Sequence, residues 1–514
     1  MAIKDDLVTG ALLGTEHQAL PEISVGGQLG ELIARLSAQV PQLSRERLLL
    51  QLASLLALYQ RAGKVLPVND GDELSICEEL KLPSVSAKSS RHLKSILQDN
   101  ESLLAEWLAA VARAKKRVSE ECLPELLEYC LKQTRLQELV SQVADSRGRW
   151  LARYNPDWNY LLARTGPALD LDNARQLWET GNVGDRCRLL ASLRVTDAAL
   201  ARELVMSTWA EDPADQRVEF LDAFSTGLSI EDEDFLEKKA LDDKRKEVRQ
   251  RAVALLARIP GSGLSERMKE RLFSCLVIKG MFGKNLEVSL PEACDKSMAR
   301  DGINPKQFDS RMGEKAGWLC QMVGLVNPSV WRERFSCSPS ELIQMAAKTE
   351  WSLPLLIGWV EAARLHRDET WVSVLVLQTD TAAAESLVQI LPPDRREEVV
   401  AEYLRKNDSW QAFTGAKYDH RLLSMFQALS HTWSEQFSRL IVKSVDQLLS
   451  RDKQAVLFGA VTSRIATSLT PLLVDEVAAS WQRFINENHA SKSLLESALS
   501  TLSLRKEMHD ALLE

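Results

Sequence analysis

One pattern occurs three times in the stretch that decides the fold: Arg186-Cys-Arg-Leu-Leu-Ala-Ser-Leu193, Arg217-Val-Glu-Phe-Leu-Asp-Ala-Phe224 and Arg249-Gln-Arg-Ala-Val-Ala-Leu-Leu256. After each arginine, apolar residues at positions +3, +4 and +7 lie on one face of an α-helix. The arginines recur at intervals of 31 and 32 residues, which is enough for two short helices per unit. The pattern therefore predicts an all-α chain in which stacked helical units form an α-solenoid.

The composition also favours helices. The chain has 514 residues, of which 45% are apolar and only 6% are aromatic, and helix-forming Leu, Ala, Glu, Arg and Gln are common. This apolar content is ample for a continuous core. The net charge of −8 and the pI near 5.7 are opposite to the basic surface of a general nucleic-acid binder. We therefore expect a chain folded throughout, and the charge argues against a nucleic-acid partner.

The third unit resembles a HEAT repeat. Asp242 and Asp243 form an acidic turn, and a Val-Arg pair that ends at Arg249 follows, and then small and large apolar residues. In HEAT repeats an aspartate and an arginine bridge adjacent units, so the resemblance implies this role for Asp242 or Asp243 and Arg249. Arg186 and Arg217 lack the preceding valine, so the resemblance is less complete at these two positions.

Breaks in the helical pattern divide the chain into four predicted regions. Lys284-Asn-Leu-Glu-Val-Ser-Leu-Pro291 alternates apolar and polar residues like a short strand and interrupts the repeats. The C-terminal helices, including five from Tyr418 to the end, vary in length, as degenerate repeats do, and would also fit a separate bundle. The predicted regions are an N-terminal helical region at 1–145, HEAT-like repeats at 146–270, a looped-out irregular insertion at 271–335, and C-terminal helical repeats at 336–514.

The sequence contains no targeting, membrane, metal or cofactor signal. No window approaches the roughly 18 uninterrupted apolar residues of a membrane span, and the charged N-terminus lacks the apolar core of a signal peptide. The eight cysteines form no C-x-x-C pair, and the seven histidines form no H-x-x-x-H pair. We expect a cytoplasmic protein with reduced thiols and without a metal, a cofactor or catalytic residues.

Several short strings, taken in order, resemble a bacterial domain family of unknown function. They are Gly10-Ala-Leu-Leu-Gly-Thr-Glu16, the segment from Arg147 to Trp158, the repeat from Leu241 to Ser262, and Asp301-Gly-Ile303 together with Gly313-Glu-Lys-Ala-Gly-Trp318. Members of that family are often encoded beside a MoxR-type AAA+ ATPase, a von Willebrand factor A-domain protein and a SWIM zinc-finger protein. The resemblance implies an ATPase-linked complex and no catalytic residues.

The first candidate site gathers guanidinium groups and indoles at the start of the repeats: Arg147, Arg149, Trp150, Arg153 and Trp158. Such residues could stack on a nucleic-acid base or bind an acidic segment of a partner. In the second interpretation, which we favour, the tryptophans anchor the first unit and the arginines pair with acids.

The second candidate is the excursion at 277–318, since long loops on a rigid scaffold often carry contacts. A docking loop and a tolerated insertion both fit this segment. Its candidate partner-binding residues are Lys284, Arg300, Asp301 and Trp318.

Two functions from different classes remain open. The favoured one is a non-enzymatic scaffold or adaptor that presents a helical-repeat surface to proteins, with the MoxR-type AAA+ ATPase or the von Willebrand factor A-domain protein as expected partners. The alternative is a HEAT-like nucleic-acid binder or a DNA-repair glycosylase of the helical-repeat type that uses the arginines and tryptophans at 147–164.

Overall fold

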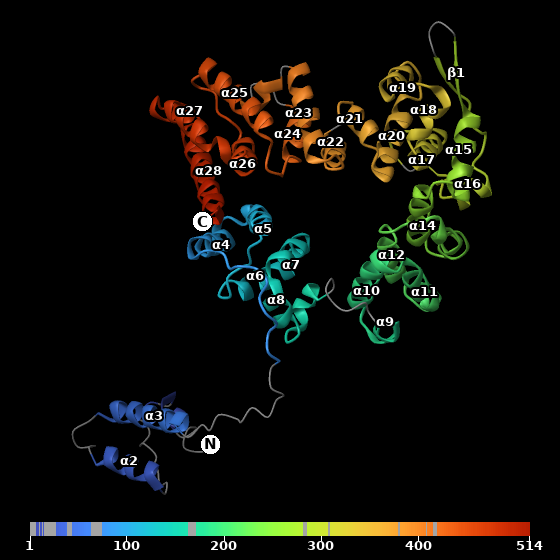
Figure 1. Ribbon diagram of the computed structural model, residues 1–514. Coiled ribbons are helices and arrows are strands. Elements are labelled where there is room, and N and C mark those ends of the chain that lie inside the picture. Colours follow the sequence, from blue (N-terminus) through green and yellow to red (C-terminus); the bar gives the residue numbers. More distant parts are fainter. Residues whose placement is uncertain are drawn as a thin grey trace. The chain divides into compact units, whose positions relative to one another are not determined.

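The computed structural model is predominantly helical, which confirms the all-α prediction (Figure 1). The chain divides into two compact units, Met1–Ile76 and Cys77–Glu514. Among the described helices, none combines the length and the apolar character that crossing a bilayer requires. The structure describes residues 7–9, 11–12, 14, 27–38, 44–62, 75–162, 171–280, 285–306, 309–378, 381–407, 409–414 and 419–513.

The first unit contains the amphipathic helices α2 (Gly27–Ser37) and α3 (Arg45–Ala62). Leu29 and Ile33 of α2 are buried together with Leu48 and Leu52 of α3. These residues recur at helical spacing, so each helix buries one apolar stripe on the other.

The second unit begins with short helices that share one apolar core. These are α4 (Ala87–Asp99), η2 (Glu101–Leu103), α5 (Leu104–Arg113), α6 (Leu123–Leu131), η3 (Thr134–Leu136), α7 (Gln137–Val143), α8 (Asp145–Ala152) and η4 (Pro156–Leu161). Met508 and Leu512, from the end of the chain, belong to the same core.

The repeat-bearing stretch follows, and each of the three sequence motifs lies in a helix. Its elements are α9 (Leu171–Thr180), α10 (Val183–Thr196), α11 (Ala198–Thr208), α12 (Ala214–Ala223), η5 (Ile230–Asp232), α13 (Glu233–Phe235), η6 (Leu236–Ala240), α14 (Lys246–Arg258) and α15 (Gly263–Cys275). Packing of α12 on both α10 and α14 brings the three motif helices into a row. Ser229 and Asp232 make a capping box at the start of η5.

Residues 271–335 are more regular than an irregular loop. Strands β1 (Leu276–Lys279) and β2 (Asn285–Val288) pair antiparallel, with Leu276 opposite Val288. The helices α16 (Lys296–Arg300), α17 (Glu314–Leu325) and α18 (Ser329–Phe335) follow. The expected strand is therefore present as β2, with β1 as its partner, and α17 contributes to the main core.

The remaining helices extend this core to the C-terminus. They are α19 (Pro339–Ala346), α20 (Ser352–His366), α21 (Glu369–Leu375), α22 (Thr381–Val388), α23 (Pro393–Asn407), η7 (Ser409–Thr414), α24 (His420–Gln427), α25 (Glu435–Arg451), α26 (Gly459–Ser468), η8 (Pro471–Leu473), α27 (Val474–Asn486) and α28 (Lys492–Leu513). Alternate helices contact one another in the series α22, α24, α26 and α28, and α25 likewise contacts α27.

The contact between α17 and α20 depends on a glycine. A Cβ atom at Gly358 would lie 2.6 Å from the Cβ of Val323 and 2.8 Å from the carbonyl oxygen of Cys320. The two helices therefore approach so closely that no larger residue fits at this position without moving the backbone.

Candidate interaction surface

A continuous polar ladder links the three motif arginines. A guanidinium nitrogen of Arg186 lies 2.9 Å from the Asp212 carboxylate, and the Asp212 carbonyl accepts a hydrogen bond from Arg217. Arg217 Nε then lies 3.0 Å from Asp243 Oδ2, and the Asp243 carbonyl accepts a 2.6 Å hydrogen bond from Arg249. Each aspartate thus binds one arginine through its carboxylate and the next arginine through its backbone.

The ladder differs in detail from the HEAT-based expectation. Of the two candidate acids, Asp243 makes the bridge, and it reaches Arg249 only through its carbonyl, because its carboxylate is occupied by Arg217. Asp242 is exposed and lies 3.5 Å from Arg300. Arg186 and Asp212 are 26 residues apart in the sequence, and so are Arg217 and Asp243. This shared spacing is the sequence signal of the ladder, and it is recognised only when the pairing is known.

Arg217→Ala should lower the free energy of unfolding by about 1–3 kcal/mol, because it leaves the buried Asp243 carboxylate without its cation. Arg249→Ala should cost only about 1 kcal/mol, since it removes a bond to a carbonyl. Urea denaturation followed by circular dichroism measures both. The exposed Arg251, paired with Asp222, offers a control whose replacement by alanine should change little. Equal effects of Arg217→Ala and Arg251→Ala would contradict the ladder.

The arginines of the first candidate site interact with acids and hydroxyls of the same unit. Arg147 lies 3.9 Å from Glu120, and Arg153 lies 3.1 Å from Glu78. Arg149 donates a hydrogen bond to a serine hydroxyl on its own helix α8. These contacts agree with the interpretation in which the arginines pair with acids.

The tryptophans of that site differ in their roles. Trp158 packs against the core formed by α4 to η4, as an anchor would. Trp150 is half-buried, and its ring meets Tyr154 edge-on with centroids 5.2 Å apart. Arg153, by contrast, stays about half exposed.

In the second candidate site, Asp301 is buried and belongs to the interior. Its carboxylate accepts hydrogen bonds from Arg267 and Arg271 on α15, and Arg300 pairs with Glu237. Burial opposes ionisation of Asp301, but the hydrogen bonds from the two guanidinium groups outweigh it and lower the pKa of this carboxyl. The cluster therefore ties α15 and α16 together.

Trp318 is likewise buried, and its Nε1 donates a 3.1 Å hydrogen bond to the carbonyl of Pro305. Lys284 lies outside the described residues. Asp301 and Trp318 therefore contact the protein interior, and Arg300 alone of the four residues lies on the described surface.

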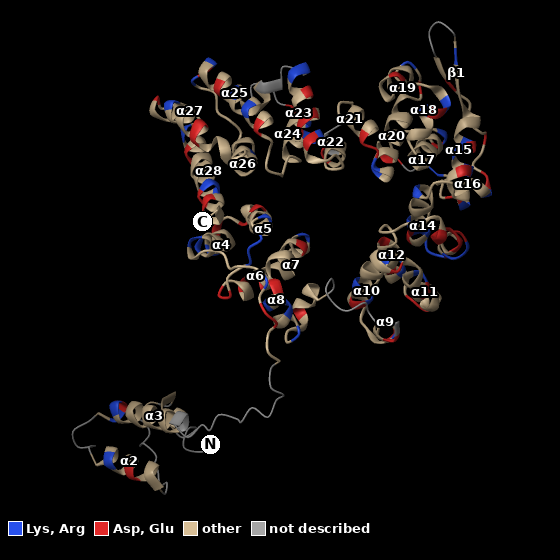
Figure 2. Cartoon of the chain, viewed as in Figure 1, with Lys and Arg blue, Asp and Glu red and all other residues tan. Residues whose placement is uncertain are grey.

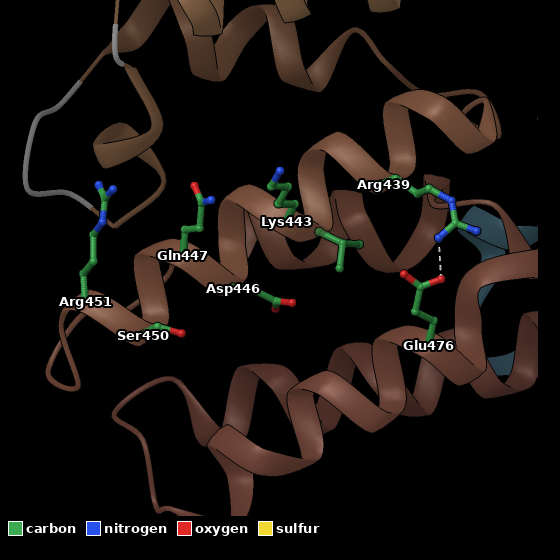
Figure 3. A pocket seen from close by; sticks show the side chains of 8 residues that line it. Arg439, Lys443, Asp446, Gln447, Ser450, Arg451 and Glu476 are labelled. Atoms are coloured by element: carbon green, nitrogen blue, oxygen red, sulfur yellow. Dashed lines mark hydrogen bonds and ion pairs between the residues drawn. The ribbon is translucent and has the colours of Figure 1, made fainter.

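A shallow groove that the sequence did not indicate runs along α25, with a volume of about 600 Å³. In Figure 3, Asp446 lies on the side of α25 toward the helix that carries Glu476, whereas Lys443, Gln447 and Arg451 extend from the other side of α25. Positions on α25 at intervals of three and four residues form the lining, so one helix face supplies most of it. The lining residues are Arg439, Val442, Lys443, Asp446, Gln447, Ser450, Arg451 and Glu476.

The acids of this groove already have donors. Arg439 lies 2.9 Å from Glu435 and 2.5 Å from Glu476, so it serves both carboxylates. Asp446 accepts hydrogen bonds from the Ser480 hydroxyl at 2.7 Å and from Trp481 Nε1 at 3.1 Å. Burial raises the pKa of the Asp446 carboxyl more than these two bonds lower it.

Two cations of the groove differ from these acids, because their charges have no ion-pair partner among the described residues. Lys443 and Arg451 are exposed, and within the part of the chain that the structure describes neither has an acid within ion-pairing distance. Lys443 and Arg451 therefore present two positive charges without an ion pair among the described residues, on a protein that is acidic as a whole.

The family model of DUF5691, a family of unknown function, matches residues 6–512. The chain belongs to this family. Comparison with curated proteins and comparison with solved structures each returned no match. Because the DUF5691 match spans nearly the whole chain, it covers the ladder and the groove as well as both compact units.

A second hollow in the DUF5691 chain, of about 320 Å³, lies between α15, α16, α17 and the end of the hairpin. Arg271 and Cys275 line it. Burial raises the pKa of the Cys275 thiol, so the thiol is protonated and poorly nucleophilic at neutral pH. Arg271 is bound to Asp301 and the Ser297 hydroxyl, so its charge is compensated within the protein.

Proposed function

We propose that this chain is a non-enzymatic scaffold or adaptor, built as an α-solenoid of degenerate HEAT-like repeats, that presents its surface to protein partners. The ladder of arginines and aspartates from α10 to α14 is the observation that carries the proposal. It joins consecutive helical units through equivalent residues, as stacked repeats require.

Polar contacts at similar sequence separations support the extension of the repeats to the C-terminus. Asp446 and Ser480 are 34 residues apart, Ala455 and Ser491 are 36 apart, and the Leu469 carbonyl binds a residue 36 positions further on. Each of these sequence separations is about the length of one pair of helices. Degenerate repeats that stack on their neighbours explain this regularity better than a bundle with long connections.

The surface suits wide, shallow contacts with proteins. Positive and negative side chains are interspersed over the helices (Figure 2). Such a surface does not offer the extended basic track that nucleic-acid backbones require. The resemblance to a family encoded beside ATPases makes a MoxR-type AAA+ ATPase or a von Willebrand factor A-domain protein the proposed partner, in the cytoplasm.

Affinity capture of the tagged chain from its own cells, with and without ATP, tests the proposal. We expect stoichiometric recovery of one of these two proteins, followed by formation of the same complex from purified components. Retention of the chain on short DNA at low salt, without either protein, would instead support the nucleic-acid-binding alternative.

A further inference from the structure

Three exposed polar side chains form a stripe along α25. Lys443, Gln447 and Arg451 follow one another at intervals of four residues, and in Figure 3 they extend from the same side of the helix. At a rise of 1.5 Å per residue, the two cations are attached about 12 Å apart along the helix axis. The stripe therefore has a defined direction and length.

The side chains of the stripe and the neighbouring groove residues favour a negatively charged ligand. Lys443 and Arg451 have no acid within ion-pairing distance among the described residues, whereas Glu476 is paired with Arg439 and Asp446 accepts two hydrogen bonds from α27. An incoming carboxylate would meet two available cations. An incoming cation would have to displace donors that are already bound.

We propose that the groove along α25 binds an extended acidic segment of a partner protein, with two carboxylate side chains about four residues apart. An extended chain advances about 3.3 Å per residue, so four residues cover about 13 Å and match the separation of the two cations. Gln447, midway between them, can donate to and accept from the backbone of the segment. This inference rests on the proposed scaffold function and names the chemistry of one partner contact.

The test uses the full chain and a fluorescein-labelled peptide, Gly-Ser-Glu-Ser-Gly-Ser-Glu-Ser-Gly, with binding measured by fluorescence anisotropy. We expect the charge reversal K443E/R451E to weaken binding about tenfold, because two attractive pairs become repulsive. A peptide with glutamine at both glutamate positions should lose binding to the same extent, and added salt should weaken binding of the original peptide. The control is K348E, which reverses an exposed charge in the turn after α19, outside the groove.

Three results of the peptide assay would overturn the groove assignment. They are absence of binding to the unaltered chain, equal binding by K443E/R451E, and tighter, competing binding of a short DNA duplex to the same two side chains. Both cations are exposed, so the variant should keep its fold, which circular dichroism checks. If K443E/R451E still captures the ATPase or the A-domain protein at the level of the unaltered chain, only the groove assignment fails. If the unaltered chain captures neither protein, the scaffold proposal itself fails.

Discussion

Replacing Asp232 by alanine is expected to lower the opening free energy of the repeat helices by about 3–5 kcal/mol. Asp232 is fully buried and accepts hydrogen bonds from Arg194 at 2.9 and 2.7 Å and from Arg202 at 2.7 Å. The Arg194 side chain is also fully buried. Loss of the carboxylate would therefore leave a guanidinium group in the interior without an anion, which is the costly way to disrupt a buried ion pair.

Hydrogen exchange of the α10 amides, together with a urea denaturation curve, measures this effect. Asp234→Ala is the matched control, because Asp234 is two residues away but exposed, and its pair with Lys238 should contribute little. A cost below about 1 kcal/mol for Asp232→Ala would contradict the assignment of a desolvated pair.

The same carboxyl adds acid sensitivity to this region. Burial opposes ionisation of Asp232, but the hydrogen bonds from Arg194 and Arg202 outweigh it and lower its pKa below the ordinary 3.8. A lowered folded-state pKa contributes stability that is present above 3.8 and is lost as the pH falls through the folded pKa. The difference in free energy of unfolding between the unaltered chain and Asp232→Ala should therefore become smaller below about pH 4.

The second large effect is expected at Glu106, which links α5 to the last helix, 399 residues away in the sequence. Both carboxylate oxygens of Glu106 accept from Arg505, at 2.7 and 2.9 Å, and the Arg505 side chain is fully buried. Lys116 also donates to the carbonyl of Leu512, near the end of α28. Glu106→Ala should therefore weaken the packing of α28 on α4 and α5 by about 3–5 kcal/mol.

Hydrogen exchange distinguishes this local loss from general unfolding. We expect faster exchange in α4, α5 and the C-terminal half of α28, and unchanged exchange in α10 to α14. Glu121→Ala provides the control, because Glu121 and its partner Lys94 are both exposed. Faster exchange along the whole unit, or none at all, would show that the pair does not act as a local connection.

Helices could be predicted from the sequence because their apolar residues recur at a regular local spacing. The five helices expected from Tyr418 to the end correspond to α24 to α28 among the described residues. The helical stretch at 123–143 is interrupted near Gln133, where the backbone leaves the helical region. Apolar periodicity does not report such a break, because the stripe continues across it.

The candidate sites were less predictable. Asp301 and Trp318 were predicted as candidate partner-binding residues, but both are buried in the structure. The cations of the α25 groove gave no signal, because an exposed lysine and an exposed arginine are ordinary on an amphipathic helix. Only the pairing of neighbouring acids with other donors makes these two cations available.

The sequence by itself determined the helical class and the positions of the three motif helices, since the apolar pattern of each helix depends on residues within a few turns of one another. The tertiary structure alone decided that α28 packs against α4 and α5, that Asp243 binds Arg217 through its carboxylate, and which charges remain unpaired. The physical reason is that a charged side chain has many possible partners at long range in the sequence. Its actual partner depends on which helices the apolar core brings together.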